Sequence, residues 1–522
     1  MARHLQARVD EGNATMSVSL PAENYFREPT SSSILYLHVG FMILAWIGAL
    51  SILASLQFTR SNLTYPARIL LLGLHALGII FGLAYNSRTP DLYRNSSHHS
   101  LAWTLSAIAI LESFLSILRS FSRSYSNKAN FDASHELQPL VSSSSLFQES
   151  EDQIHPTDPT YLASLRENRR NRTNSIRVDA QAAIDGRYQR LSSRVKSWSK
   201  LISASRFVPT VASTSSLFIM AMIILAFVSL CTGIVTMAGI FHGDHIFNGL
   251  AHFIKGGVFF FFGVITLLRC IGCFSGLGWA WNLKASTGFP SRKWGRSVTM
   301  EGLECLLIFI YGITNVFLEH IAGWGEAWTA QDLEHVAISL LFIGGGLCGM
   351  MVESRDVWAL SKNQILEDSL TLNEKQNLIR GYSTNPVPAM IIFLLGTILG
   401  GHHQSTVEST MMHKWFGNFL TAASITRSLT YLLLYLAPAR SRSPSRPPSE
   451  LVTSFCLMSG GLMLMASNRD TVDAMIENDL NAMLVATVTM GITAVLMAWC
   501  FALVALKEWA QRREGLTKAG HA

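Results

Sequence analysis

The chain has 522 residues, of which 49% are hydrophobic and 15% are charged, and its mean hydropathy is +0.28. This composition indicates a membrane protein and argues against a set of soluble domains. The sequence contains no P-loop, dinucleotide fingerprint, nucleophile elbow or kinase motif set, which argues against soluble-type nucleotide chemistry. The net charge of +6 is attributed to cytosolic loops that face anionic lipid, so no nucleic-acid partner is expected.

Eleven segments are long and apolar enough to cross a bilayer, since a span needs roughly 20 mostly apolar residues. They lie at 34–57, 67–86, 101–118, 214–240, 246–271, 299–320, 333–352, 385–402, 411–437, 450–467 and 482–507. The sequence therefore predicts an all-α integral membrane protein with about eleven transmembrane helices.

A polar stretch at 119–207 divides these segments into three and eight. The predicted parts are a tail (1–33), a three-helix membrane domain (34–118), a linker (119–207), an eight-helix membrane domain (208–507) and a basic tail (508–522). The first part of the linker is Ser-rich and has few bulky apolar residues, which is a composition typical of disorder. Its second part, 176–206, mixes apolar residues with regularly spaced Arg and Lys, which predicts an amphipathic helix on anionic cytosolic lipids.

The orientation follows from the loops, because short segments rich in Lys and Arg stay in the cytosol. Such segments alternate consistently with acidic or neutral ones and place the linker and the carboxyl terminus in the cytosol. Eleven spans then place the amino terminus in a lumen or outside the cell. The predicted location is the endomembrane system or the plasma membrane.

Most of the sixteen histidines lie at or just inside the predicted lumenal face. Spacings of three, four and seven place His245, Asn248 and His252 on one stripe of the fifth span, which should face other helices because a polar row facing lipid is costly. The next four spans bring imidazole or carboxylate to the same level. The candidate metal ligands are His242, Asp244, His245, His252, Glu319, His320, Glu334, His335, His402, His403 and His413.

A shell of His, Asp and Glu suits zinc, iron, manganese or copper and does not choose among them. The alternative is that these residues have no function, because helix ends near lipid head groups tolerate His, Glu, Lys and Trp. The cytosolic ends of the same helices contain almost no His, which favours a site. Glu301 and Glu304 lie nearer the cytosolic end and would serve a separate site or an ion path.

The three-span part has its own histidines. His38 lies near the outer end of the first span, and His98 and His99 precede the third. A haem b needs two imidazoles on facing helices, which His38 with His98 or His99 could supply. His75 lies mid-span without an obvious partner. Three spans are fewer than the four helices of a self-contained haem bundle, so a structural role competes with the haem.

Several blocks of the sequence carry a family resemblance. They are 242–282, with Gly-Leu-Ala-His-Phe-Ile-Lys-Gly-Gly and Gly-Trp-Ala-Trp-Asn, and 315–320, 328–335 and 443–449. These blocks resemble the fungal Ytp family of multi-pass membrane proteins. The resemblance covers about 214–507, and the first three spans look like the small domain that accompanies it. In the first span, His38, Met42 and Trp46 are similar to the first helix of transmembrane b cytochromes. The resemblance implies a likeness to electron-transport membrane proteins and no established substrate.

Three classes of function follow. The first is electron transfer through haem b or a bound metal, which predicts a Soret band for the haem. The second is a metal site for lipid hydrolysis, with water activated by the ion, or for transport of an ion. The third is a scaffold of the endomembranes, in which the polar residues only pack helices. The expected partner in each class is the lipid bilayer, and the oligomeric state is left open.

Overall fold

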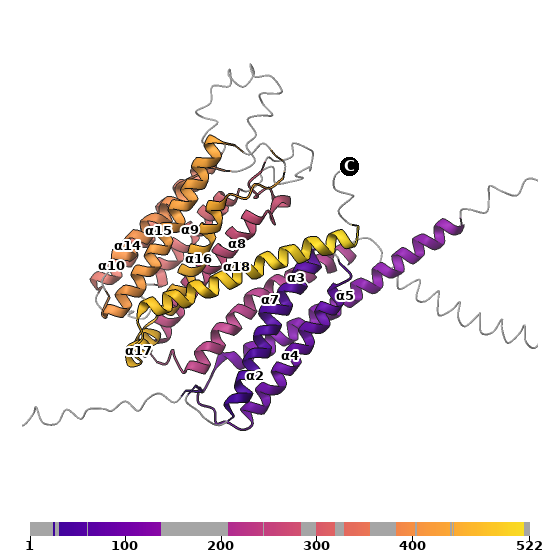
Figure 1. Cartoon of the computed structure of the whole chain (residues 1–522), viewed down its shortest axis with the longest axis horizontal. Helices are drawn as coiled ribbons and strands as arrows, with labels where there is room; N and C mark the ends of the chain where they lie inside the picture. Colours follow the sequence, from indigo (N-terminus) through magenta and orange to yellow (C-terminus); the bar gives the residue numbers. More distant parts are fainter. Residues whose placement is uncertain are drawn as a thin grey trace, which may run out of the picture.

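The protein is seen here as a computed structural model (Figure 1). It describes residues 24–26, 31–59, 61–136, 207–243, 245–282, 299–318, 328–354, 383–401, 404–438, 441 and 443–515. Within these ranges the secondary structure is helical, apart from one isolated bridge between Trp281 and Ser445. The predicted all-α class is confirmed.

Nine helices in the described ranges are long and apolar enough to cross a membrane. They are Ser32–Gln57, Thr64–Asn86, Ser97–Ile117, Thr214–Ala238, His245–Ile271, Asp332–Glu353, Val407–Leu436, Pro448–Ala466 and Ala482–Arg513. The other two predicted spans correspond to α9 (Met300–Leu318) and α14 (Val387–Gly401). At 15 residues, α14 is about 22 Å long, whereas the hydrocarbon core is about 30 Å thick. Eleven spans in a three-plus-eight arrangement therefore stay a prediction.

The first helices form one group, the N-terminal helix group. It contains α2 (Ser32–Ile43), the π-helix η2 (Leu44–Ala49), α3 (Leu50–Phe58), α4 (Thr64–Asn86) and α5 (Ser97–Glu136). The helix α5 continues past the predicted end of its span at 118. The next helix, α7 (Phe207–Ala238), packs against α5, and its Ile219 and Met222 share a core with Leu53 and Leu105. The first helix of the predicted eight-helix part thus lies beside the first three spans.

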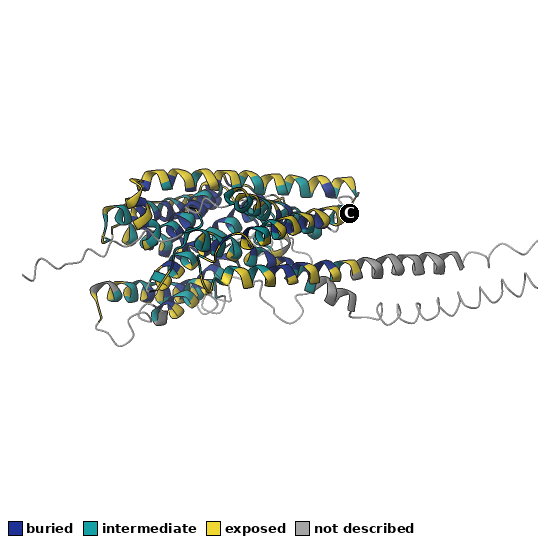
Figure 2. Ribbon diagram, turned by 90° about the horizontal axis from the view of Figure 1, so that it is seen from below, coloured by how far each residue is buried: buried dark blue, intermediate teal, exposed yellow. Residues whose placement is uncertain are grey.

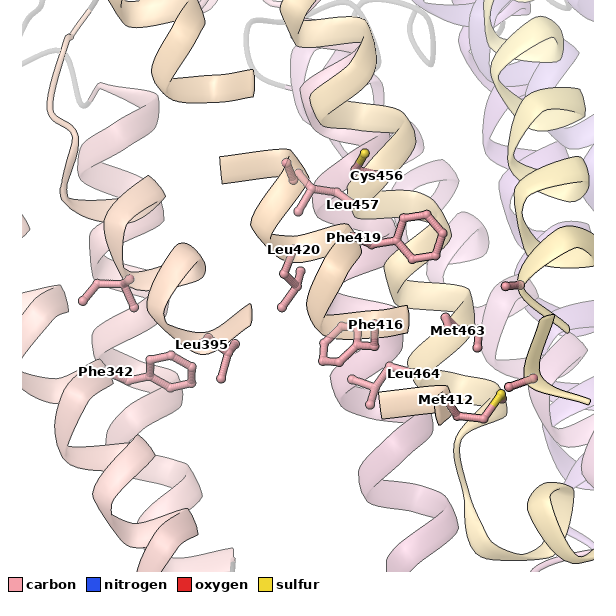
Figure 3. Packing of buried hydrophobic residues seen from close by; sticks show 14 of the residues in the cluster. Phe342, Leu395, Met412, Phe416, Phe419, Leu420, Cys456, Leu457, Met463 and Leu464 are labelled. Atoms are coloured by element: carbon pink, nitrogen blue, oxygen red, sulfur yellow. The ribbon is translucent and has the colours of Figure 1, made fainter. Parts of the chain in front are cut away.

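The remaining helices form the C-terminal helix group. They are α8 (His245–Ile271), α9, α10 (Ala330–Glu353), α14, α15 (Val407–Leu436) and α16 (Pro448–Ala466). The central helix is α16, which packs against both α8 and α15. Of the residues in its most apolar stretch, 72% are buried. Figure 3 shows Phe416 and Leu420 of α15 beside Leu457 and Leu464 of α16, all buried in one core.

Glycine allows α8 and α16 to touch along their backbones. A Cβ on Gly256 would lie 2.5 Å from the carbonyl oxygen of Gly461, and a Cβ on Gly461 would lie 2.5 Å from the backbone nitrogen of Phe260. Small residues at such crossings let membrane helices approach closely, where van der Waals packing replaces the hydrophobic effect. These contacts fix the position of α8, which carries residues of both sites described below.

The last helix joins the two groups. After the short α17 (Arg469–Glu477), α18 (Ala482–Arg513) runs along both of them and contacts α16 and α3 (Figure 1). The indole nitrogen of Trp499 donates to Ser51 Oγ at 3.0 Å. The exposed apolar residues of α18 include Met483 and Val495, and exposed positions are yellow in Figure 2. This pattern is expected for a helix that faces lipid.

Candidate functional site

A cavity of about 1890 Å³ lies within the C-terminal helix group. Helices α8, α9, α10, α14, α15 and α16 line it, together with one side of α7. Most of its wall is apolar and includes Phe259, Ile308 and Leu457. Small-molecule pockets usually have volumes of about 300 to 1,000 Å³, so this cavity has room for a larger molecule.

Three predicted ligands, the histidine group, line this cavity from different helices: His252 of α8, His335 of α10 and His413 of α15. The ring centroids of His252 and His413 are 5.8 Å apart, with the rings nearly perpendicular at 86°. Sequence analysis therefore identified a pair of imidazoles that the fold brings together.

Both rings are oriented by their own helices. Nδ1 of His252 donates to the carbonyl oxygen of Asn248 at 2.8 Å, and Nδ1 of His413 donates to that of Ser409 at 2.9 Å. Because a carbonyl oxygen can only accept, Nδ1 carries the hydrogen and Nε2 becomes the acceptor of each neutral ring. Metal-binding histidines are commonly held in this way, and so are histidines that bind polar ligands.

Other predicted ligands have different neighbours. Nδ1 of His245 donates a hydrogen bond to Asp470 of α17, whose second carboxylate oxygen accepts the backbone N–H of Phe241 at 2.6 Å. The exposed ring of His242 lies 4.5 Å, centroid to centroid, from that of Tyr93. Glu334 is exposed and, with His335, borders a second cavity of about 680 Å³.

The rest of the predicted set lies outside the described residues: Asp244, Glu319, His320, His402 and His403. In the parts of the chain that are described, no three His, Cys, Asp or Glu side chains are grouped closely enough to hold a metal ion. The full ligand shell stays a prediction.

The histidines of the N-terminal helix group face different neighbours. Nδ1 of His38 donates to the carbonyl oxygen of Gly78 on α4 at 2.7 Å, whereas Nδ1 of His98 lies 3.1 Å from Thr232 Oγ1 on α7. His99 is exposed, and its Nε2 accepts from the indole of Trp103 on the same helix at 3.1 Å.

These positions test whether the residues fit a haem. The helix α7 supplies the fourth helix that the three predicted spans lacked, and His38 and His98 lie on different helices as a bis-histidine haem requires. However, a Cβ on Gly82 would lie 2.8 Å from the His38 ring, and one on Gly233 would lie 3.1 Å from the His98 ring. Each ring already packs against a neighbouring backbone and has a hydrogen-bond partner there, and the haem stays a prediction. We derive no step through haem.

Other side chains of the N-terminal helix group also pack between its helices. His75, for which the sequence offered no partner, lies with Nε2 at 2.8 Å from Ser106 Oγ, and its ring meets Trp46 edge-on at 4.9 Å between centroids. Phe41 and Phe81 stack at 5.4 Å. His75 is therefore accounted for by packing and hydrogen bonding.

A second polar site lies toward the opposite end of the C-terminal helix group. It is the ionic cluster, which consists of Arg269, Glu301, Glu304, Arg427 and Glu450. Each of these side chains is at most 5% exposed. Charged side chains inside a membrane are costly and usually mark a functional site.

The cluster contains three ion pairs. Arg269 Nη2 lies 2.8 Å from Glu301 Oε1, and Arg427 Nε lies 2.8 Å from Glu450 Oε1. The third pair, Arg427 Nη1 to Glu304 Oε1, is longer at 3.4 Å. Glu304 and Arg427 also line the large cavity.

Neighbouring groups orient the two arginines. Arg269 Nε donates to the carbonyl oxygen of Trp279 at 2.7 Å, and its guanidinium lies 3.7 Å over the ring of Trp281. Arg427 Nη2 donates to Thr266 Oγ1 at 3.2 Å. Sequence analysis named only the two glutamates of α9. An arginine within the apolar run of α15 was the signal that could have found the rest.

The fold and these sites define a multi-pass α-helical membrane protein. The sequence model described as "Protein YTP1-like, C-terminal" matches residues 225–508, and a domain of unknown function, DUF2427, matches residues 20–122. The chain therefore belongs to the YTP1-like family, as the resemblance predicted.

Relatives occur in two yeasts. The chain is 29% identical over 521 residues to the uncharacterized membrane protein C3B8.06 of Schizosaccharomyces pombe, covering 95% of this chain and 98% of that protein. It is 40% identical over 280 residues to the uncharacterized membrane protein YCR061W of Saccharomyces cerevisiae, covering 51% of this chain and 43% of that protein. It is 23% identical over 249 residues to Protein YTP1 of the same yeast, covering 48% and 44%. No solved structure matches the chain.

Proposed function

We propose that the C-terminal helix group binds an amphipathic molecule of lipid size inside the membrane. The cavity of about 1890 Å³, with its apolar wall and its polar groups at two levels, carries this proposal. An apolar wall accommodates a hydrocarbon or aromatic body, and a few oriented polar groups select a head group.

The two polar levels are far apart. His413 and Arg427 lie fourteen residues apart on α15 and both line the cavity, so they are separated by about 21 Å along the helix axis. That length is about two thirds of the hydrocarbon core, which is about 30 Å thick. The cavity therefore suits an elongated molecule that lies along the bundle.

The wall also reaches two surfaces of the helix group. At the level of the histidine group it includes Gln404 and Thr406, which precede α15, and Arg469 of α17. Farther along, it includes Val258 and Leu307, which are both more than half exposed. An amphipathic molecule could enter from the predicted lumenal side or from the lipid.

Blocking the cavity tests the proposal. Leu307→Trp adds bulk to its wall, whereas Leu306→Trp on the same helix changes an exposed residue that does not line it. Protein in nanodiscs should bind isotope-labelled lysophosphatidylcholine or oleate saturably. We expect Leu307→Trp to weaken this binding about tenfold, a loss of about 1.4 kcal/mol, and Leu306→Trp to leave it unchanged. Non-saturable binding, or equal binding by both variants, would contradict the proposal.

The His252–His413 pair favours a second candidate, a transition-metal ion used in lipid hydrolysis or in metal transport. The two rings lie in one cavity with both Nδ1 atoms held by carbonyl oxygens, and His335 lines the same wall. When bound, the ion would act as a Lewis acid toward a ligand head group. Metal analysis and zinc titration of the protein and of His252→Ala test this candidate. An absorption spectrum of the same samples tests the haem of the electron-transfer alternative.

We also propose the orientation in which the histidine end faces the lumen or the cell exterior and the carboxyl terminus faces the cytosol. The exposed Asn95 begins an Asn-Ser-Ser sequon in the loop before α5, at the histidine end. A glycan on this residue, removed by Asn95→Gln and by glycosidase, is the expected result. A cytosolic modification of the same loop would reverse the assignment.

A further inference from the structure

The ionic cluster does not balance its own charge. Three carboxylates face two guanidinium groups, which leaves an excess of one negative charge if every member is ionised. Among the described residues, the other titratable groups around the cluster are Tyr431, Cys270 and Cys305, and Glu353, Cys348 and Arg446 lie near those two cysteines. Glu353 would only add negative charge, and Arg446 is exposed, where water screens it.

Three carboxylate oxygens of the cluster also lack a hydrogen-bond donor within the described residues. They are Glu301 Oε2 and both oxygens of Glu450, of which Oε1 has the ion pair with Arg427 but no hydrogen bond, and the buried Arg269 Nη1 likewise has no acceptor there. Glu301 and Glu450 are both 0% exposed. An uncompensated buried carboxylate is costly enough that such groups bind a proton or another cation instead.

The geometry selects Glu304 as the group that takes the cation. Glu301 and Glu450 lie in the first turns of α9 and α16, where the helix N-terminus stabilises a carboxylate, and each has an ion pair of 2.8 Å. Tyr431 Oη also donates to Glu301 at 3.4 Å. Glu304 lies beyond the first turn, and its ion pair with Arg427 is the longest of the three in the cluster at 3.4 Å.

Glu304 is also the glutamate of the cluster that lines the cavity, beside Arg427. We propose that the cavity takes an amphipathic organic cation whose charged group binds at Glu304, and that Glu304 holds a proton when this cation is absent. Either cation leaves the buried cluster neutral. The exchange breaks the O–H bond of the Glu304 carboxyl group and releases the proton to water, while the organic cation is held by charge and forms no bond.

This inference rests on the proposed binding cavity and narrows its occupant to cations. The test uses tetraphenylphosphonium and tetraphenylborate, which share shape and apolar surface but have opposite charge. With protein in nanodiscs, we expect tetraphenylphosphonium to bind and to release about one proton, measured by calorimetry in buffers of different ionisation enthalpy. Its affinity should fall about tenfold for each pH unit below the pKa of the carboxyl group, because one proton competes with one cation.

Variants test whether Glu304 is the residue at which the proton is exchanged for the organic cation. Glu304→Gln should abolish proton release and the pH dependence of binding, and should remove one protonated carboxyl band from the infrared spectrum of the empty protein. Glu304→Asp should retain proton release with weaker binding. Glu508→Gln, which changes a half-exposed carboxylate on α18, is the matched control and should behave as wild type.

The outcomes separate the two proposals. Binding of lysophosphatidylcholine without binding of tetraphenylphosphonium would overturn the cation inference and leave the cavity function standing. Equal binding of tetraphenylborate, or proton release that persists in Glu304→Gln, would also overturn it. If no amphiphile of any charge binds and the carboxyl band is still present, the cavity function fails and only the proton site remains.

Discussion

The two helix groups both bury arginine and glutamate, but in different ways. In the N-terminal helix group Arg68 and Glu112 form one pair, 2.9 Å between Nη2 and Oε1, with side chains 5% and 1% exposed. Gln57 Oε1 accepts from Arg68, and Ser215 Oγ donates to Glu112 at 2.9 Å. This pair is neutral and joins four helices.

The ionic cluster of the C-terminal helix group is larger, has three carboxyl groups for two guanidinium groups and borders a cavity through Glu304 and Arg427. Arg68 and Glu112 do not line that cavity. The comparison teaches that burial alone does not identify a binding site. Charge imbalance beside a cavity does, because only there can an added cation be both required and admitted.

Removing one partner of the Arg68–Glu112 pair should have the largest effect on the stability of the protein. Glu112→Ala leaves the buried Arg68 guanidinium without its carboxylate, and the expected loss of stability is about 3–5 kcal/mol. Thermal unfolding in detergent, monitored by circular dichroism, measures it. The double variant Arg68→Met/Glu112→Leu replaces both charges with apolar groups and should recover most of the loss. A single variant as stable as wild type would show that the pair does not hold these helices.

The second comparison concerns how the two groups pack. A Cβ at Gly461 would lie within 3 Å of the α8 backbone, so Gly461→Ala should cost about 1–3 kcal/mol by forcing α8 and α16 apart. Gly73 on α4 has nothing within 4 Å of an added Cβ, and Gly73→Ala should be neutral or stabilising by up to about 1 kcal/mol. Thermal unfolding compares the two. Equal effects would show that backbone contact does not distinguish the groups.

A third change sharpens the contrast between the two sets of charges. Glu304→Gln replaces a carboxyl group that holds a proton in the empty protein with a neutral amide of similar shape, so its stability should stay within about 1 kcal/mol of wild type. Glu112→Gln removes half of a balanced pair and should be clearly less stable than Glu304→Gln in the same unfolding measurement. The reverse order would mean that Glu304 is a structural carboxylate.

A small effect on stability is expected at the loop where the two helix groups meet. Tyr93 Oη donates to the carbonyl oxygen of Ile240 at 2.8 Å. Burial, and then the charge of Asp470, raise the pKa of Tyr93 above its usual value. Tyr93→Phe should cost about 1 kcal/mol.

The raised pKa also sets the pH at which this contribution is lost. The neutral phenol is favoured in the folded protein, so the stabilisation is complete below the usual tyrosine pKa and disappears as pH rises through the raised value. The ultraviolet difference titration of wild type against Tyr93→Phe reports this pKa. A midpoint at or below the usual tyrosine value would contradict the assignment.

Hydropathy predicted the helical class because a span must be apolar over its whole length, and this property is local. The same reasoning stopped the third span at 118, although α5 continues to Glu136, because a helix can extend beyond the apolar stretch that crosses the bilayer. Local reasoning also separated α7 from the first three spans. Which helices become neighbours depends on packing between distant segments, such as Ile219 against Leu105.

The candidate site shows the same limit of prediction from local sequence patterns. Helical spacing placed His252 and Asn248 on one stripe, and the two are linked by the Nδ1 hydrogen bond. Spacing did not show that His245 pairs with Asp470 or that Arg427 reaches Glu304, because these partners lie more than 100 residues apart. Periodicity describes one helix face, whereas a site needs the identity of the facing helix.

The hydrogen bond from Ser215 to Glu112 has a consequence for how the protein is made. The chain emerges from the ribosome in order, so Glu112 is synthesised 103 residues before Ser215, and Arg68 is synthesised earlier still. Until then Arg68 is the donor to both oxygens of Glu112, and the additional bond to Oε1 is missing. We therefore expect the first three helices to reach their final packing only after α7 has been inserted beside them. The separation of two hydrogen-bonding partners along the chain thus sets the order in which the helices can complete their packing during biosynthesis.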